Sequence, residues 1–113
     1  MTALAHAVST VTGRVLAAHR TPDGTLDAPG LLAEAIRVRR ATQDLEAIVN
    51  PGGVSDQTRA RLAILQGADI AHRRVLDTHV PGWVEALDAA RRQYPRSNRA
   101  KVMTKAGRAL GLL

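Results

Sequence analysis

The side chains best suited to chemistry lie close together, with Asp69 three residues before His72 and His79 seven residues after it. An Asp-x-x-His pair on one helix can ligate a metal or transfer a proton. No third ligand stands at a supporting spacing, because His6 and His19 belong to a different predicted helix. Both later histidines fall on the apolar stripe of their helix, where a half-buried histidine bonded to a neighbouring carboxylate is commoner. We therefore interpret His72 and His79 as structural residues.

Other catalytic patterns are missing from the sequence. The Asn-Pro-Gly-Gly segment at 50–53 precedes a predicted helix but lacks the Gly-Lys-Ser/Thr ending of a phosphate-binding loop. Ser55 follows no predicted strand, so it cannot sit on a strained nucleophile elbow. The glutamates Glu34, Glu46 and Glu85 lie on separate predicted helices, and there is no cysteine. The sequence predicts a protein that is not an enzyme, with no catalytic residue, cofactor, metal or small-molecule substrate.

Charge is concentrated at the C-terminal end of the chain. Residues 1–88 carry nine basic and ten acidic side chains, whereas residues 89–113 carry seven basic ones and no acid. A near-neutral body with a cationic tail calls for an anionic partner, because like charges held together repel unless something neutralises them. We predict that the partner or nucleic-acid binding residues are these seven: Arg91, Arg92, Arg96, Arg99, Lys101, Lys105 and Arg108.

The last predicted helix is amphipathic, with Lys101, Lys105 and Arg108 within about 60° of one another around its axis. The opposite side carries Val102, Met103, Ala106, Ala109 and Leu110. Four interpretations stay open: a solvated outer face, nucleic acid, an acidic protein surface and a membrane. The membrane is the least favoured, because the apolar side is short and has no Trp or Phe anchor.

Two further basic clusters lie inside predicted helices. Arg37, Arg39 and Arg40 stand near Glu34 and Asp44, and Arg73 with Arg74 stands near Asp69 and Asp77. Spacings of three and four residues permit surface ion pairs that contribute a few tenths of a kcal/mol each, about 0.3–0.5. We interpret both clusters as solvated helix faces.

Five helices must position these residues. Apolar stripes and end signals predict helices over residues 3–19, 28–49, 56–78, 83–94 and 98–110. Asp27 and Ser55 are the expected N-caps of the second and third helices, and Ser97 that of the last. Pro81 and Gly82 are expected to break the chain between the third and fourth helices.

Composition agrees with a helical fold, since the commonest apolar residues are Ala (20), Leu (13) and Val (10), with one Trp and no Phe. We predict an all-α single domain over residues 1–113, a small helical bundle of three main helices plus two shorter C-terminal helices. The expected core consists of Leu4, Val8, Val11, Val15, Leu31, Val38, Leu45, Leu62, Leu65, Leu76 and Leu87.

No signal-peptide pattern or bilayer-length apolar run is present, so we expect a cytoplasmic protein or one in a particle assembled there. The predicted function is that of a non-enzymatic helical structural or adaptor subunit of a larger assembly, such as a phage-like particle or a nucleoprotein complex. Its partner would be an acidic protein surface or copies of itself, with nucleic acid an open alternative. In the alternative function, a DNA-binding regulator, the segment 94–97 is the turn of a helix-turn-helix, and Asn98 and Arg99 reach base edges.

Overall fold

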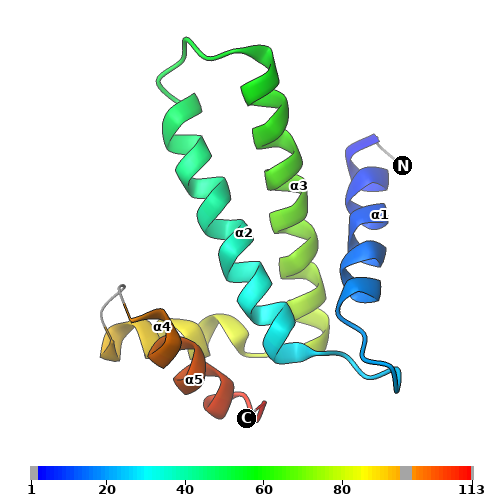
Figure 1. Cartoon of the computed structure of the whole chain (residues 1–113), viewed down its shortest axis with the longest axis vertical. Helices are drawn as coiled ribbons and strands as arrows, with labels where there is room; N and C mark the ends of the chain where they lie inside the picture. The colour runs from blue at the N-terminus through cyan, green and yellow to red at the C-terminus, as the bar shows by residue number, and fades with distance from the viewer. Residues whose placement is uncertain (1–2, 95–97, 113) are drawn as a thin grey trace.

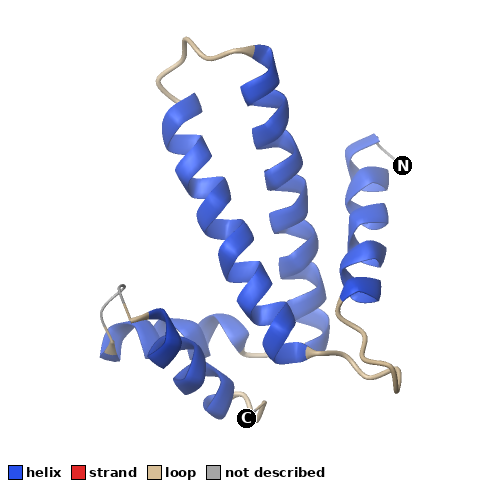
Figure 2. Ribbon diagram, viewed as in Figure 1, coloured by secondary structure: helices blue, strands red, loops and turns tan. Residues whose placement is uncertain are grey.

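The computed structural model describes the backbone of residues 3–94 and 98–112, and side chains from Thr10 onward within those ranges. Its five helices are α1 (Ala3–Ala18), α2 (Ala28–Val49), α3 (Asp56–His79), α4 (Trp83–Gln93) and α5 (Arg99–Ala109) (Figure 1). The described residues form no strand, and their only β feature is an isolated bridge between Arg20 and Leu26 (Figure 2). The all-α prediction is confirmed.

Capping side chains fix the two long helices. Asp27 Oδ1 accepts a hydrogen bond of 3.1 Å from the backbone N–H of Gly30 at the start of α2. Ser55 Oγ accepts one of 3.2 Å from the N–H of Thr58 at the start of α3. Each bond satisfies a donor that the first turn of a helix would otherwise leave unpaired. Both predicted caps are therefore confirmed, whereas the predicted cap Ser97 lies outside the described residues.

The helices form an L-shaped arrangement. The α2 and α3 helices run antiparallel as a long hairpin, α1 packs along α3, and α4 packs with α5 at the open end of the hairpin (Figure 1). The Cα radius of gyration is 15.4 Å, larger than the ~13 Å expected of a compact chain of this length. This open shape leaves an inner angle between α2 and the α4–α5 pair.

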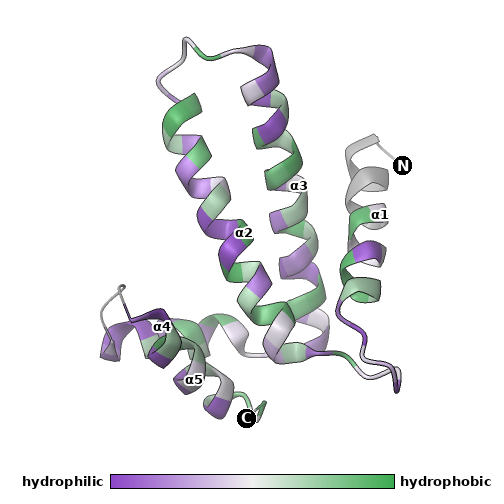
Figure 3. Ribbon diagram, in the orientation of Figure 1, coloured by the Kyte–Doolittle hydropathy of each residue, from purple (hydrophilic) through white to green (hydrophobic). Residues whose placement is uncertain are grey.

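The core lies where all five helices approach one another, at the open end of the hairpin. Leu31, Leu32, Val75 and Leu76 are its largest fully buried side chains. The other end of the hairpin is less covered, and Ile48 and Ile64 are 59% and 72% exposed there. Apolar residues thus continue along α2 and α3 beyond the core (Figure 3).

Burial divides the predicted core in two. Val15, Leu31, Leu62, Leu76 and Leu87 are buried, as predicted. Val11 is half-buried and packs against the core. Three other positions are half-buried and do not pack against it, so their assignment to the core was wrong: Val38, Leu45 and Leu65. Val38, Leu45 and Leu65 lie on the α2–α3 hairpin. Each faces the other helix of the hairpin on one side only, because two helices alone cannot enclose the apolar stripes that they carry. Leu4 and Val8 lie outside the described side chains.

The turn between α3 and α4 follows its predicted position. The last residue of α3 is His79, and Gly82 adopts a φ of 84°, a left-handed conformation that favours glycine. Trp83 begins α4 and is buried, and its Nε1 donates a hydrogen bond of 2.8 Å to Asp77 Oδ1. This bond ties the end of α3 to the start of α4.

Candidate functional site

The outer side of α5 carries three exposed cations. Val102, Ala106 and Gly107 bury the inner side of the helix against the rest of the protein. Lys101, Lys105 and Arg108 are exposed on the side expected from the sequence. Met103 and Leu110 are half-buried, whereas Ala109 is exposed and does not belong to the inner side as predicted.

Tyr94 extends this cationic side toward the end of α4. Its ring is half-buried, and Lys101 Nζ lies 5.8 Å from the ring centroid, within reach of a cation–π contact. The two side chains border a wide hollow of about 650 Å³. Its lining consists of Tyr94, Ala100, Lys101, Thr104, Lys105, Arg108 and Ala109. We call this surface the outer face of α5.

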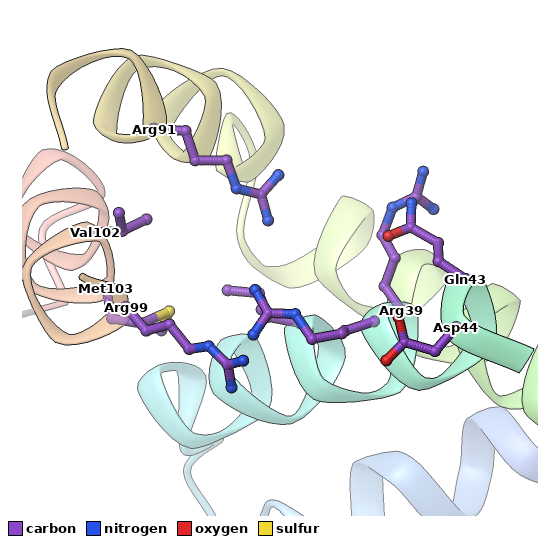
Figure 4. A pocket seen from close by; sticks show the side chains of 9 residues that line it. Arg39, Gln43, Asp44, Arg91, Arg99, Val102 and Met103 are labelled. Atoms are coloured by element: carbon purple, nitrogen blue, oxygen red, sulfur yellow. The ribbon is translucent and has the colours of Figure 1, made fainter. Parts of the chain in front are cut away.

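Two of the predicted tail residues point away from the outer face. Arg91 of α4 and Arg99 of α5 direct their side chains toward α2, where they line a cleft of about 280 Å³ (Figure 4). Arg92 is exposed and lines neither hollow, and Arg96 lies outside the described residues. The seven tail cations therefore do not share one surface.

Helix α2 supplies the opposite wall of this cleft. Arg39 and Arg40 line this wall and are half-buried, so they keep contact with water while facing the cleft. Arg37, in contrast, is exposed and paired with Glu34 as predicted. The α2 residues of the cleft recur at helical spacing, a pattern that marks one side of a helix: Ile36, Arg39, Arg40, Gln43 and Asp44.

The cleft holds more positive than negative charge. Arg39 Nη1 lies 3.5 Å from Asp69 Oδ2 of α3, the one ion pair that involves a cleft arginine among the described residues. Within that same set, no carboxylate oxygen lies within 4.0 Å of Arg40, Arg91 or Arg99. Guanidinium groups gathered in one recess repel one another, so an anion bound between them would be stabilised.

The histidine segment has different contacts from those expected. His72 is buried, and its Nδ1 donates to the carbonyl oxygen of Ala68 at 2.7 Å, not to Asp69. Asp69 pairs with Arg39 across the hairpin, and its Oδ1 is buried with no partner in the described part of the chain. His79 is exposed, so its assignment to the apolar stripe was wrong. The described residues contain no group of three or more potential metal ligands.

The glutamate that pairs with Arg37 also lies near the buried histidine. The hydrogen bond from Arg37 lowers the pKa of Glu34 below its ordinary value, while partial burial opposes that change. The charges of Arg37, His72 and His19 add to the lowering. The ring centroids of His19 and His72 are 6.4 Å apart in an edge-to-face arrangement. This cluster joins the turn after α1 to α2 and α3 and has the character of a packing contact.

Comparison with protein-family models, with curated proteins and with solved structures found no match for this chain. Among the described helices, none is both long and apolar enough to span a bilayer. The function must therefore be argued from the two cationic surfaces themselves.

Proposed function

We propose that this chain is a non-enzymatic helical adaptor or structural subunit that binds an acidic protein surface through its basic C-terminal helix. The observation that carries this proposal is the exposure of Lys101, Lys105 and Arg108 along one side of α5. No acidic residue follows Asp88 in the sequence, so nothing in the tail itself can neutralise them. Membership of a larger assembly, such as a phage-like particle, belongs to the same proposal.

The state of the chemistry-bearing side chains supports an adaptor over an enzyme. His72 has its Nδ1 committed to a backbone carbonyl, and Ser55 has its hydroxyl committed to the cap of α3. Asp77 accepts from the indole of Trp83. Each of these groups has a structural task that explains its position.

The distribution of acids favours a different protein as partner over a second copy. The body of the chain has ten acidic and nine basic residues, so it offers no acidic excess to receive the tail of another copy. Glu34, Asp56 and Asp69 are already paired with arginines of the same chain. An external acidic surface can neutralise the outer face of α5 without breaking these pairs.

The alternative is a DNA-binding regulator, in which Asn98 and Arg99 read bases. Arg99 instead lines the cleft toward α2, a direction that removes it from a projecting recognition surface (Figure 4). We therefore favour an acidic protein surface as the partner, and the experiment below also measures the binding of duplex DNA.

The test is charge reversal on the outer face of α5, in the variant Lys101→Glu, Lys105→Glu and Arg108→Glu. A matched control reverses three exposed arginines elsewhere on the body: Arg14, Arg61 and Arg74. Circular dichroism should show that both variants stay folded, because all six side chains are exposed. Truncation of α5 is unsuitable, since it removes Val102 and Ala106 from the core.

Fluorescence anisotropy with labelled poly-glutamate and with duplex DNA provides the measurement. We expect the α5 variant to bind poly-glutamate markedly more weakly than the wild-type chain and the control to bind it nearly as well, with an affinity that falls as salt rises. Equal loss in both variants would show a net-charge effect only and would overturn the proposal. Tight binding of duplex DNA would favour the DNA alternative. A plot of log affinity against log salt concentration should then have a slope of about −0.9 for each phosphate neutralised.

A further inference from the structure

We infer that the inner angle between α2 and the α4–α5 pair is a second binding site, which takes a short acidic peptide segment with an aliphatic anchor residue. The site goes beyond the proposed function, because none of Lys101, Lys105 and Arg108 lines it. Four arginines from three helices converge there: Arg39, Arg40, Arg91 and Arg99.

Two clefts adjoin at this inner angle. The cleft of about 280 Å³ adjoins a second one of about 260 Å³, and the two share Ile36, Arg39 and Arg91 in their linings. Together they form a groove lined by residues of α2 and α4. We call it the arginine groove. Its two parts differ in charge, since the second contains the acids Asp69 and Asp88 beside Arg73.

Charge complementarity selects an anionic occupant for the first part. Its arginines outnumber its single acid, Asp44, and three of them have no carboxylate within 4.0 Å among the described residues. The planar guanidinium group donates two parallel hydrogen bonds to a carboxylate or a phosphate. An acidic segment laid between Arg40, Arg91 and Arg99 would relieve their mutual repulsion.

Aliphatic side chains line the same cleft beside the arginines. Ile36 of α2 is half-buried there. On α5, Met103 is half-buried and Val102 is buried (Figure 4). A leucine or isoleucine within an acidic segment can cover these side chains while its neighbours pair with the guanidinium groups. Burying an apolar side chain of that size strengthens binding by about tenfold or more.

The lining favours a peptide over nucleic acid. Proteins that hold single strands stack bases on exposed aromatic rings, and none of the described residues that line the first cleft is aromatic. The second contains Trp83, but this residue is only 8% exposed and belongs to the core. A duplex reaches projecting surfaces more readily than a recess between helices.

The test uses a fluorescein-labelled peptide of glutamates interrupted by two leucines, with the full chain at 0.15 M salt. The variants are Arg40→Ala and Arg99→Ala, singly and together. The matched controls are Arg61→Ala and Arg74→Ala, which remove the same charge from exposed positions outside the groove. We expect each groove variant to weaken binding about tenfold, because each removes a charge-assisted hydrogen bond. The controls should stay within about twofold, since neither side chain lines the groove and exposed charges outside it are screened at this salt.

A second peptide has serine in place of both leucines and tests the aliphatic lining made by Ile36, Val102 and Met103. It should bind about tenfold more weakly than the leucine peptide. The variant with alanine at Lys101, Lys105 and Arg108 should still bind the leucine peptide, which separates this site from the outer face of α5. Equal effects of the groove and control variants would overturn the inference. The inference would also be overturned if a single-stranded oligonucleotide bound more tightly than the peptide and the groove variants lost that binding. The partner class would then be nucleic acid.

Discussion

Trp83 Nε1 lies 2.8 Å from Asp77 Oδ1, and this hydrogen bond spans the turn that takes the chain from α3 into α4. Trp83 is buried in the core, whereas Asp77 stands on the exposed side of α3. Arg91 is carried on the same helix as Trp83. The bond therefore helps to set the distance between the two walls of the arginine groove.

Replacing Asp77 with alanine should lower the free energy of unfolding by about 1–3 kcal/mol, because the buried indole N–H would lose its acceptor. The same replacement in a Trp83→Phe background should cost much less, since phenylalanine has no N–H to satisfy. Urea denaturation of the wild-type chain, the two single variants and the double variant gives the coupling free energy between Asp77 and Trp83. Equal costs of Asp77→Ala in both backgrounds would show that the hydrogen bond contributes nothing.

Leu76→Ala should cost about 2–5 kcal/mol, because Leu76 is fully buried among residues of the core. Leu65→Ala should cost less, below about 2 kcal/mol, since its half-buried side chain keeps part of its surface in water. Both values come from urea denaturation of the single variants. A Leu65 cost as large as that of Leu76 would mean that the hairpin is covered by something beyond this chain.

The helices could be predicted because their end signals act locally. Asp27 and Ser55 each bond to an N–H three residues onward, so residue type and spacing suffice to place them. Burial depends on distant neighbours, which periodicity does not reveal. Leu45 and Leu65 follow the same stripe rule as Leu31, but they lie where the hairpin has fewer covering helices (Figure 1).

Zinc should leave the melting temperature unchanged. His72 uses Nδ1 to donate to the Ala68 carbonyl, and His79 is exposed about two helical turns away along α3. A metal that binds only the native state must stabilise it, so stoichiometric binding would raise the melting temperature. A rise of several degrees with zinc, reversed by a chelator, would contradict this prediction.

Asp23 provides a pH-dependent contact in the α1–α2 connection. Hydrogen bonds from the hydroxyl of Thr21 and then from the hydroxyl of Thr25 lower its pKa from 3.8 to about 2. Because the folded pKa lies below the unfolded one, the stabilisation is present above the unfolded value and is lost as pH falls through about 2. Thr21→Val should raise this pKa toward 3.8, measured by an NMR titration of the carboxyl carbon. Thr104→Val, an exposed control, should not change it.

The cationic tail could be predicted from a charge count, but the arginine groove could not. Arg91 and Arg99 lie more than fifty residues after Arg39 and Arg40 in sequence, and they line one cleft only because α4 and α5 fold back toward α2. One local signal was present, since Ile36, Arg39, Arg40, Gln43 and Asp44 recur along one side of α2. That pattern is typical of solvated helix faces as well, so it could not identify a binding wall without the fold.

The pair between Arg39 and Asp69 crosses from α2 to α3, and its acid is the more buried partner. The side chains are 43% and 12% exposed, and the Nη1–Oδ2 distance is 3.5 Å. Removing one partner of a fully buried pair costs about 3–5 kcal/mol, and the exposure of Arg39 reduces the expected cost of Arg39→Ala to about 1–3.

The Asp69→Asn background tests this assignment, because the neutral amide no longer needs a cation. There, Arg39→Ala should cost at least 1 kcal/mol less than in the wild-type chain, roughly the net value of one charged hydrogen bond. Arg40→Ala is the matched control from the same helix, since no carboxylate lies within 4.0 Å of Arg40 among the described residues. It should change stability by less than about 0.5 kcal/mol in either background. If Arg39→Ala costs the same in both backgrounds, Arg39 does not stabilise the buried carboxylate, and Asp69 must be stabilised by other groups.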